Sequence, residues 1–265
     1  MSVTTTKPLA SKTEYIITWE KLPPNFILPD DPVDNIIQPE LAMALKESLA
    51  TAGLTNESVL IATNFGICVT VNGKTVVKAP DWVYVPNASP LLSGKIRRSY
   101  TPNAEGEMPT IVMEFLSETE GGEYSIKRTY PYGKWWFYER LLQVPVYVIF
   151  DPATGDLEVY HLTSDGYEQQ EPDAEKRYWI AQLGLFLGVW EGTRLDMQAL
   201  WLRWWDAEGN MLLWGTEQAL LAEEQLQEAQ QQAEAAQQQA EQERNRADIL
   251  AQQLRSLGVD PDNLV

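Results

Sequence analysis

The sequence predicts an α/β fold, with a mixed central sheet flanked by helices and a C-terminal α-helical coiled coil. Short apolar runs bounded by turn residues, such as 146–150, predict buried strands. Residues 38–52 carry apolar side chains at helical spacing. Residues 216–257 carry an apolar heptad pattern. Strand patterns and helix patterns alternate along the chain before residue 216, which is typical of helices packed on a sheet.

The predicted elements follow one another closely in the body of the chain. An Asn72-Gly73 pair predicts a tight hairpin turn between two strands. Helices are expected at 38–52 and 132–144, and strands at 59–62, 65–71, 75–77, 82–85, 110–116, 146–150 and 157–162. The expected organisation is a disordered N-terminal segment over 1–14, a folded body over 15–215, a coiled-coil helix over 216–257 and a short tail over 258–265.

Composition limits the classes of function. The 265 residues carry a net charge of -18, which argues against a generic surface for binding polyanions. The single cysteine, Cys68, excludes an internal disulfide framework and a cysteine-based zinc cage, and the single His161 excludes a multi-histidine metal site. Cys68 lies in an apolar run and is expected in the core rather than as a nucleophile, and His161 is expected on a strand surface. No apolar run reaches the length of a membrane span, so we expect a cytoplasmic protein.

The C-terminal segment has a seam of twelve positions spaced alternately by three and four residues. Seven seam positions are alanine and four are leucine, and only Glu243 is polar. The pattern predicts one continuous helix that pairs with a second copy or with a helical partner. A single solvated helix is the alternative. Gly258 and Pro261 indicate where the helix stops.

Three charged residues are candidates for metal binding and catalysis. Asp81 precedes the apolar strand 82–85, and Glu114 lies inside the apolar strand 110–116. A buried carboxylate is costly unless a metal or a partner holds it. Lys134 begins the aromatic segment Trp135-Trp136-Phe137-Tyr138, whose side chains are expected to pack on the sheet, with base stacking as the alternative. Carboxylates suit Mg²⁺ or Mn²⁺, and a lysine can stabilise charge that develops on a phosphate.

The order of these motifs resembles the Uma-two family of restriction endonucleases, within the PD-(D/E)XK nuclease superfamily. The motifs are Pro80-Asp81, Glu114-Phe115-Leu116-Ser117, Lys134 to Tyr138, and the run from Val144 to Pro152. The end of the tail, 254–261, is similar to family members with a coiled-coil extension. The resemblance implies a restriction-endonuclease-like nuclease domain over 15–215.

The resemblance also implies roles for individual residues. Asp81 and Glu114 match the carboxylates that hold Mg²⁺ or Mn²⁺, and Lys134 matches the family's helix-borne catalytic lysine. Leu116 stands where the superfamily has a lysine on the strand. The aspartate that often precedes the family's lysine is missing, and Glu123 could replace it. Glu40, on the first helix, is the second candidate for an accessory acidic residue.

The implied activity is metal-dependent hydrolysis of phosphodiester bonds in DNA, by a metal-activated water. Two basic clusters could contact DNA, although solvated loops are an equal interpretation: Lys95, Arg97 and Arg98, and Lys127 and Arg128. The alternative function is a weak or inactive nuclease fold that serves as a coiled-coil binding or assembly module. The acidic body and the missing aspartate favour this alternative.

Overall fold

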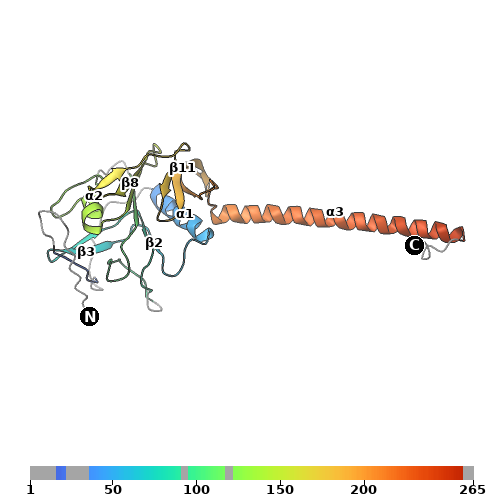
Figure 1. The fold of residues 1–265 in the computed structure, drawn as a ribbon, viewed down its shortest axis with the longest axis horizontal. Helices are drawn as coiled ribbons and strands as arrows, with labels where there is room; N and C mark the ends of the chain where they lie inside the picture. Colours follow the sequence, from blue (N-terminus) through green and yellow to red (C-terminus); the bar gives the residue numbers. More distant parts are fainter. Residues whose placement is uncertain (1–15, 22–35, 91–94, 117–121, 259–265) are drawn as a thin grey trace. The chain divides into compact units, whose positions relative to one another are not determined.

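The computed structural model describes residues 16–21, 36–90, 95–116 and 122–258. The expected disordered segment over 1–14 and most of the tail over 258–265 lie outside these residues. The chain divides into two compact units, residues 1–214 and residues 215–265, and each is described by itself (Figure 1).

The first unit is built on a six-stranded mixed sheet. The strand order is β2-β5-β6-β7-β8-β9. Neighbours β6 and β7 run parallel, and the other neighbouring pairs run antiparallel. The strands are β2 (Leu60–Ala62), β5 (Trp82–Val85), β6 (Ile111–Phe115), β7 (Val146–Phe150), β8 (Leu157–Leu162) and β9 (Tyr167–Gln169). All five residues of β7 are buried, as expected for a central strand.

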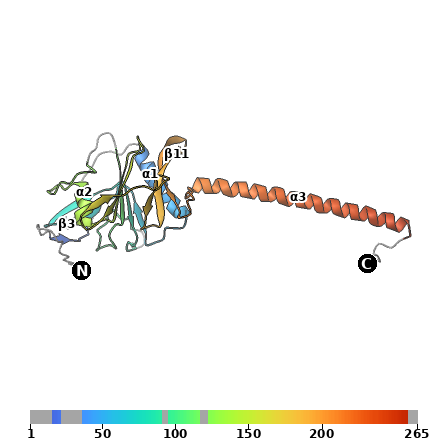
Figure 2. The ribbon, with the colours of Figure 1, turned by 45° about the horizontal axis from the view of Figure 1, so that its top comes forward.

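Alternate residues of the central strands enter two separate cores. Met113 and Trp82 belong to the core on one face of the sheet, where helix α1 (Ile37–Thr51) packs. Val112 and Val83 belong to the core on the other face. That second core also holds the helix formed by α2 (Lys134–Trp136) and η1 (Phe137–Leu142), which connects β6 to β7. Figure 2 shows the sheet between these layers.

Two smaller sheets complete the unit. One consists of β1 (Ile17–Thr18), β3 (Ile67–Val71) and β4 (Lys74–Lys78), with Asn72 and Gly73 in the turn as expected. The other consists of β10 (Tyr178–Ile180), β11 (Leu185–Arg194) and β12 (Met197–Trp205). The second sheet contributes to the core on the α1 face, where the indole N–H of Trp204 donates to the carbonyl of Leu45 at 3.3 Å.

The helix expected over 132–144 is shorter than the sequence indicates. It begins at Lys134, because the residue before it, Gly133, has an extended backbone. From Phe137 it continues as a π-helix, and it ends at Gln143, which adopts a left-handed conformation. Trp136, Phe137 and Tyr138 are buried in the core, so this aromatic segment packs as expected.

The single cysteine and the single histidine of the chain both lie on strands of the first unit. Cys68 is buried on β3, and burial raises the pKa of its thiol to about 11, which confirms it as a core residue. His161 lies on β8 and is half-buried, so it is less exposed than the strand surface position implied.

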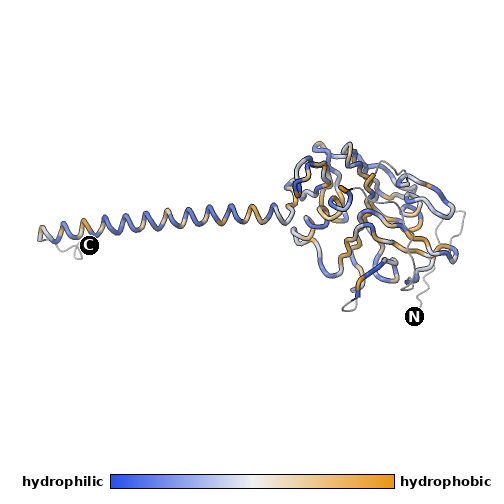
Figure 3. The backbone as a smooth tube through the Cα atoms, turned by 180° about the vertical axis from the view of Figure 1, so that it is seen from behind, coloured by the Kyte–Doolittle hydropathy of each residue, from blue (hydrophilic) through white to orange (hydrophobic). Residues whose placement is uncertain are grey.

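The second unit is one long helix, α3 (Gly215–Ser256). None of the 42 residues of this helix, all within the described part of the chain, is buried. Figure 3 shows a mainly hydrophilic helix with separate apolar positions along it. A single chain does not test the expected coiled-coil pairing. Across the described ranges, no helix is both long and apolar enough to cross a membrane.

Candidate active site

Asp81 and Glu114 meet where two neighbouring strands end. Trp82 of β5 lies opposite Met113 of β6 in an antiparallel pair, so one step further along each strand brings Asp81 beside Glu114. The Asp81 carboxylate accepts a hydrogen bond from the backbone N–H of Phe115 at 2.5 Å. Strand pairing therefore brings together two carboxylates that are far apart in the sequence.

Glu114 is fully buried and each of its oxygens has a partner. Because side chains alternate along a strand, Glu114 points to the same face as Val112, where α2 and η1 pack. The Lys134 ammonium lies 3.2 Å from Oε2, and the Tyr138 hydroxyl donates to Oε1 at 2.9 Å. The aromatic helix thus supplies both the cation and the hydrogen bond that hold this carboxylate.

Glu123 completes the group from the segment before the helix. Its Oε1 lies 3.4 Å from the Lys134 ammonium, and its backbone carbonyl accepts a hydrogen bond from the Tyr147 hydroxyl at 3.0 Å. The side chain is buried, and within the described residues its Oε2 atom has no hydrogen-bond partner. Lys134 therefore lies between two buried carboxylates.

The position of Lys134 depends on a close backbone approach. A side chain at Gly133 would overlap the backbone carbonyl of Ser125. Phe137 N–H donates to the Gly133 carbonyl at 3.0 Å, which starts the helix at this point. Glycine at 133 lets the 122–133 segment fold back against the helix start, and this brings Glu123 to Lys134.

Burial raises the pKa of Glu114 to about 8. The negative charges of Asp81 and Glu123 act in the same direction, whereas the Lys134 ammonium and the Tyr138 hydrogen bond oppose it. Burial also raises the pKa of Tyr138 well above its ordinary value, so its hydroxyl stays a neutral donor. A second positive charge at this site would favour the ionised form of Glu114.

The acidic oxygens of the site are of the kind that a divalent cation such as Mg²⁺ prefers. Within the described ranges, no three acidic, histidine or cysteine side chains are grouped to hold one metal ion. Mg²⁺ commonly takes only one or two carboxylates, with waters and substrate phosphates as its other ligands. Asp81 and Glu114 meet this smaller requirement, and Glu123 Oε2, which has no hydrogen-bond partner among the described residues, adds acidic oxygen nearby.

Gln38 is a site residue that the sequence reasoning missed. It is buried near the start of α1, and its amide donates to the carbonyl of Phe115 at 2.6 Å. Asp81 and Gln38 thus bind the N–H and the carbonyl of the same residue, directly after Glu114. Both also line a small pocket with Pro39, Ala42, Thr63 and Asn64. The available signal was helical phase, because Gln38 falls on the buried stripe with Ala42 and Leu45.

Glu40 lies on another face of α1. Its carboxylate forms an ion pair with Arg194 of β11 at 2.7 Å, and Arg194 also pairs with Glu47 at 2.6 Å. Glu40 and Glu47 are two helical turns apart, so one arginine reaches both. The structure therefore brings Glu123, Asp81, Glu114 and Lys134 together, and it assigns Glu40 to the contact between α1 and β11.

A family model, Uma2, described as putative restriction endonuclease, matches residues 27–198, well over half of the chain. The chain belongs to the Uma2 family. No curated protein matches the chain. The resemblance recognised in the sequence is confirmed, and the Uma2 match contains Asp81, Glu114, Glu123 and Lys134.

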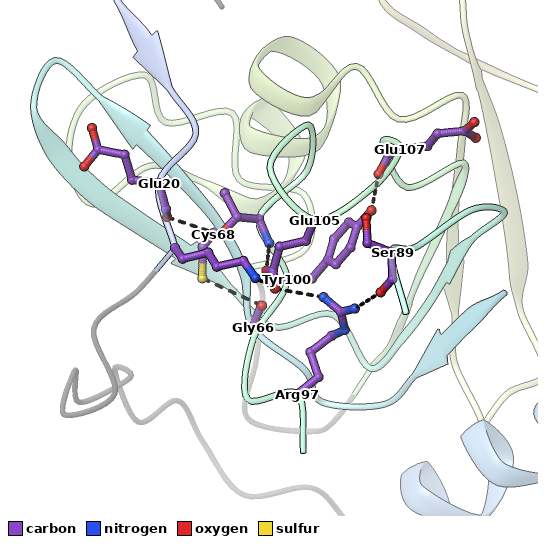
Figure 4. A network of polar contacts seen from close by, with 10 residues as sticks. Glu20, Gly66, Cys68, Ser89, Arg97, Tyr100, Glu105 and Glu107 are labelled. Atoms are coloured by element: carbon purple, nitrogen blue, oxygen red, sulfur yellow. Dashed lines mark hydrogen bonds and ion pairs between the residues drawn. The ribbon is translucent and has the colours of Figure 1, made fainter. Parts of the chain in front are cut away.

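The first basic cluster lies within the Uma2 match but is partly structural. Arg97 donates to Glu105 at 2.8 Å and to the carbonyl of Ser89 at 2.5 Å, and Glu105 also accepts from the N–H of Thr101 (Figure 4). Both Arg97 and Glu105 are largely buried. Arg97 thus holds a loop together, while Lys95 and Arg98 are exposed.

The second basic cluster lies on the connection between two site residues. Lys127 and Arg128 are exposed, and they fall between Glu123 and Lys134 in the chain. The Lys127 carbonyl accepts a hydrogen bond from Gly133 at 2.9 Å, one residue before Lys134. This cluster is therefore tied to the backbone that positions the site lysine.

Proposed function

We propose that this chain is a metal-dependent DNA endonuclease that hydrolyses phosphodiester bonds. The observation that carries the proposal is the convergence of Asp81, Glu114 and Lys134 inside the Uma2 match. Membership in a family of putative restriction endonucleases supports the nuclease class.

Asp81 and Glu114 would hold Mg²⁺ or Mn²⁺. When bound, such an ion polarises the phosphoryl group and lowers the pKa of a bound water. The hydrogen bond from Phe115 N–H fixes one Asp81 oxygen, and Tyr138 fixes one Glu114 oxygen. Both carboxylates are thereby oriented before any ligand arrives, which limits the reorganisation that binding requires.

Lys134 is the proposed partner of charge on the phosphate. Its ammonium is held by Glu114 and Glu123 at the start of a buried helix. An ammonium fixed in a site with little water stabilises developing charge far better than one in solvent. Glu123 acts through Lys134 by holding its position, and Gln38 acts through the Phe115 carbonyl next to Glu114.

Lys127 and Arg128 are the proposed contacts with the DNA backbone nearest to the site. They are exposed and lie on the segment that leads into Lys134. With a net charge of -18 on the whole chain, DNA binding needs such local clusters to offset repulsion. Lys95 and Arg98 are weaker candidates, because Arg97 between them is used within the fold.

A second candidate function rests on the acidic charge and on the tail. In this alternative the body has little or no activity, and α3 joins the chain to a second copy or a helical partner. The two functions are separated by a plasmid-nicking assay with Mg²⁺, with Mn²⁺ and with a chelator. Conversion of supercoiled DNA only when metal is present supports the endonuclease. Absence of conversion under every metal condition supports the assembly module.

A further inference from the structure

We propose that α3 pairs with α3 of a second copy in an antiparallel coiled coil centred on Gln238. Its apolar seam is exposed along a long helix in which no residue is buried. Leu226, Leu250 and Leu257 are 59%, 53% and 77% exposed in a single chain. A partner helix would remove this apolar surface from water.

The spacing of the seam positions is symmetric about Gln238. Its first six positions are 219, 222, 226, 229, 233 and 236, and its last six are 257, 254, 250, 247, 243 and 240. Each position in the first half has a mirror position at the same distance from Gln238. Two copies running in opposite directions therefore meet with all twelve positions in register, because a positions of one helix face d positions of the other.

Side-chain size also favours the antiparallel register. Leu257 then faces Ala219, and Leu254 faces Ala222, so a large residue packs against a small one. Leu226 faces Leu250, which places a leucine pair near each end of the paired segment. Alternating large and small residues across facing positions allows close helix approach without voids.

Glu243 separates the two orientations most clearly. In a parallel pair it would face its own copy, which places two carboxylates together in the seam. In the antiparallel pair it faces Ala233, and Arg244 and Arg246 lie beside the partner's acidic half. Like charges that face each other across a helix pair are destabilising, so this residue disfavours parallel pairing.

The charge distribution along the helix also favours antiparallel pairing. Residues 216–236 hold five acidic and no basic side chains, a net charge of -5. Residues 237–257 hold three of each sign and are neutral overall. Parallel pairing would align the two acidic halves, whereas antiparallel pairing sets each acidic half against a half that contains all three arginines.

The orientation has a structural consequence for the dimer. Gly215 precedes the centre of the seam, Gln238, by 23 residues, so an antiparallel pair would place the two Gly215 residues about 70 Å apart, at opposite ends of the rod. A parallel pair would hold both Gly215 residues at one end. Because the two proposals use different parts of the chain, the pairing can fail while the nuclease assignment stands.

The test uses cysteine variants of the full chain and a short thiol-specific cross-linker, without DNA or metal. Gln239→Cys lies beside the two-fold axis and should cross-link to itself. Leu226→Cys alone should not, but it should cross-link when mixed with Leu250→Cys. The unsubstituted chain sets the background, since its only cysteine, Cys68, is 1% exposed.

Two outcomes would overturn the proposal. Cross-linking of Leu226→Cys to itself, as efficient as in the mixture, would mean a parallel pair. A monomeric mass by light scattering at tens of micromolar would mean that the helix is solitary or meets a different protein. Cysteine variants that perturb the seam are controlled by comparing each variant's light-scattering mass with that of the unsubstituted chain before cross-linking.

Discussion

The Lys134 ammonium lies 3.2 Å from the fully buried Glu114 carboxylate, which also accepts a hydrogen bond from Tyr138. Lys134 and Tyr138 are four residues apart, on one face of the same helix. One helix therefore supplies two of the groups that hold the carboxylate, and its start at Gly133 sets their position. Shifting this helix would disturb the charge balance of the site.

Lys134→Met should lower the cleavage rate by about a hundredfold or more, because a fixed charge partner of the transition state contributes several kcal/mol. Lys127→Met is the matched control, since it removes an exposed lysine from the adjoining segment. It should weaken DNA binding while leaving turnover at saturating DNA near that of the unsubstituted chain. Single-turnover cleavage with both variants checks the assignment. A large loss in Lys127→Met, with none in Lys134→Met, would reverse the two roles.

The stability of the metal-free protein should fall as pH rises. Burial raises the pKa of Glu114 from 4.5 to about 8, so folding favours the protonated carboxyl. This contribution to the free energy of unfolding is fully present below pH 4.5 and is lost as pH rises through 8. Urea unfolding in chelator, compared with Glu114→Gln at each pH, isolates it. A difference between the two proteins that stays constant over this range would contradict the stated pKa direction.

Arg97→Gln should destabilise the fold, in contrast to Arg98→Gln. Arg97 pairs with the largely buried Glu105, and its removal leaves that carboxylate without its closest cation. Breaking a buried ion pair from one side costs about 3 kcal/mol. Arg98 is exposed, and its change should cost less than about 0.5 kcal/mol. Thermal unfolding of both variants measures the contrast, and equal midpoints would remove the structural role of Arg97.

Truncation before Gly215 should leave a folded body, because the structure divides the chain into compact units at this point. Circular dichroism and near-ultraviolet spectra of residues 1–214 should keep the signals of the tryptophan-rich core. The mass by light scattering should fall to that of a monomer. A truncated body that unfolds would show that α3 contributes to the stability of the first unit.

Local patterns in the sequence predict most of the central sheet. Strands such as Val146–Phe150 are continuous apolar runs between turn residues, and the Asn72-Gly73 turn has its usual residues. The β11–β12 hairpin has no such signal. Its turn residues, Leu195 and Asp196, both adopt positive φ angles, 48° and 62°, without a glycine or an asparagine. The strand pairing overrides the local preference there, and no local rule predicts it.

The sequence predicts only part of the candidate site, because some of its residues have no local signal. Asp81 and Glu114 stand out because carboxylates are unusual beside or within apolar strands. Gln38 does not, because its role depends on where α1 crosses the end of β6. Whether Glu123 reaches Lys134 depends on how the segment 122–133 folds back, which its composition does not reveal. Single-sequence patterns identify candidate residues, and tertiary contacts decide which of them meet.

The most direct measurement of the central claim is metal-dependent plasmid cleavage by Asp81→Asn and Glu114→Gln. Both substitutions keep the side-chain size and remove a metal-binding charge. Glu191→Gln, an exposed carboxylate of β11, is the matched control. The account predicts that the unsubstituted chain and Glu191→Gln convert supercoiled DNA with Mg²⁺ or Mn²⁺, and that the other two variants stay folded and do not. Cleavage by either site variant at the rate of the unsubstituted chain would contradict the account.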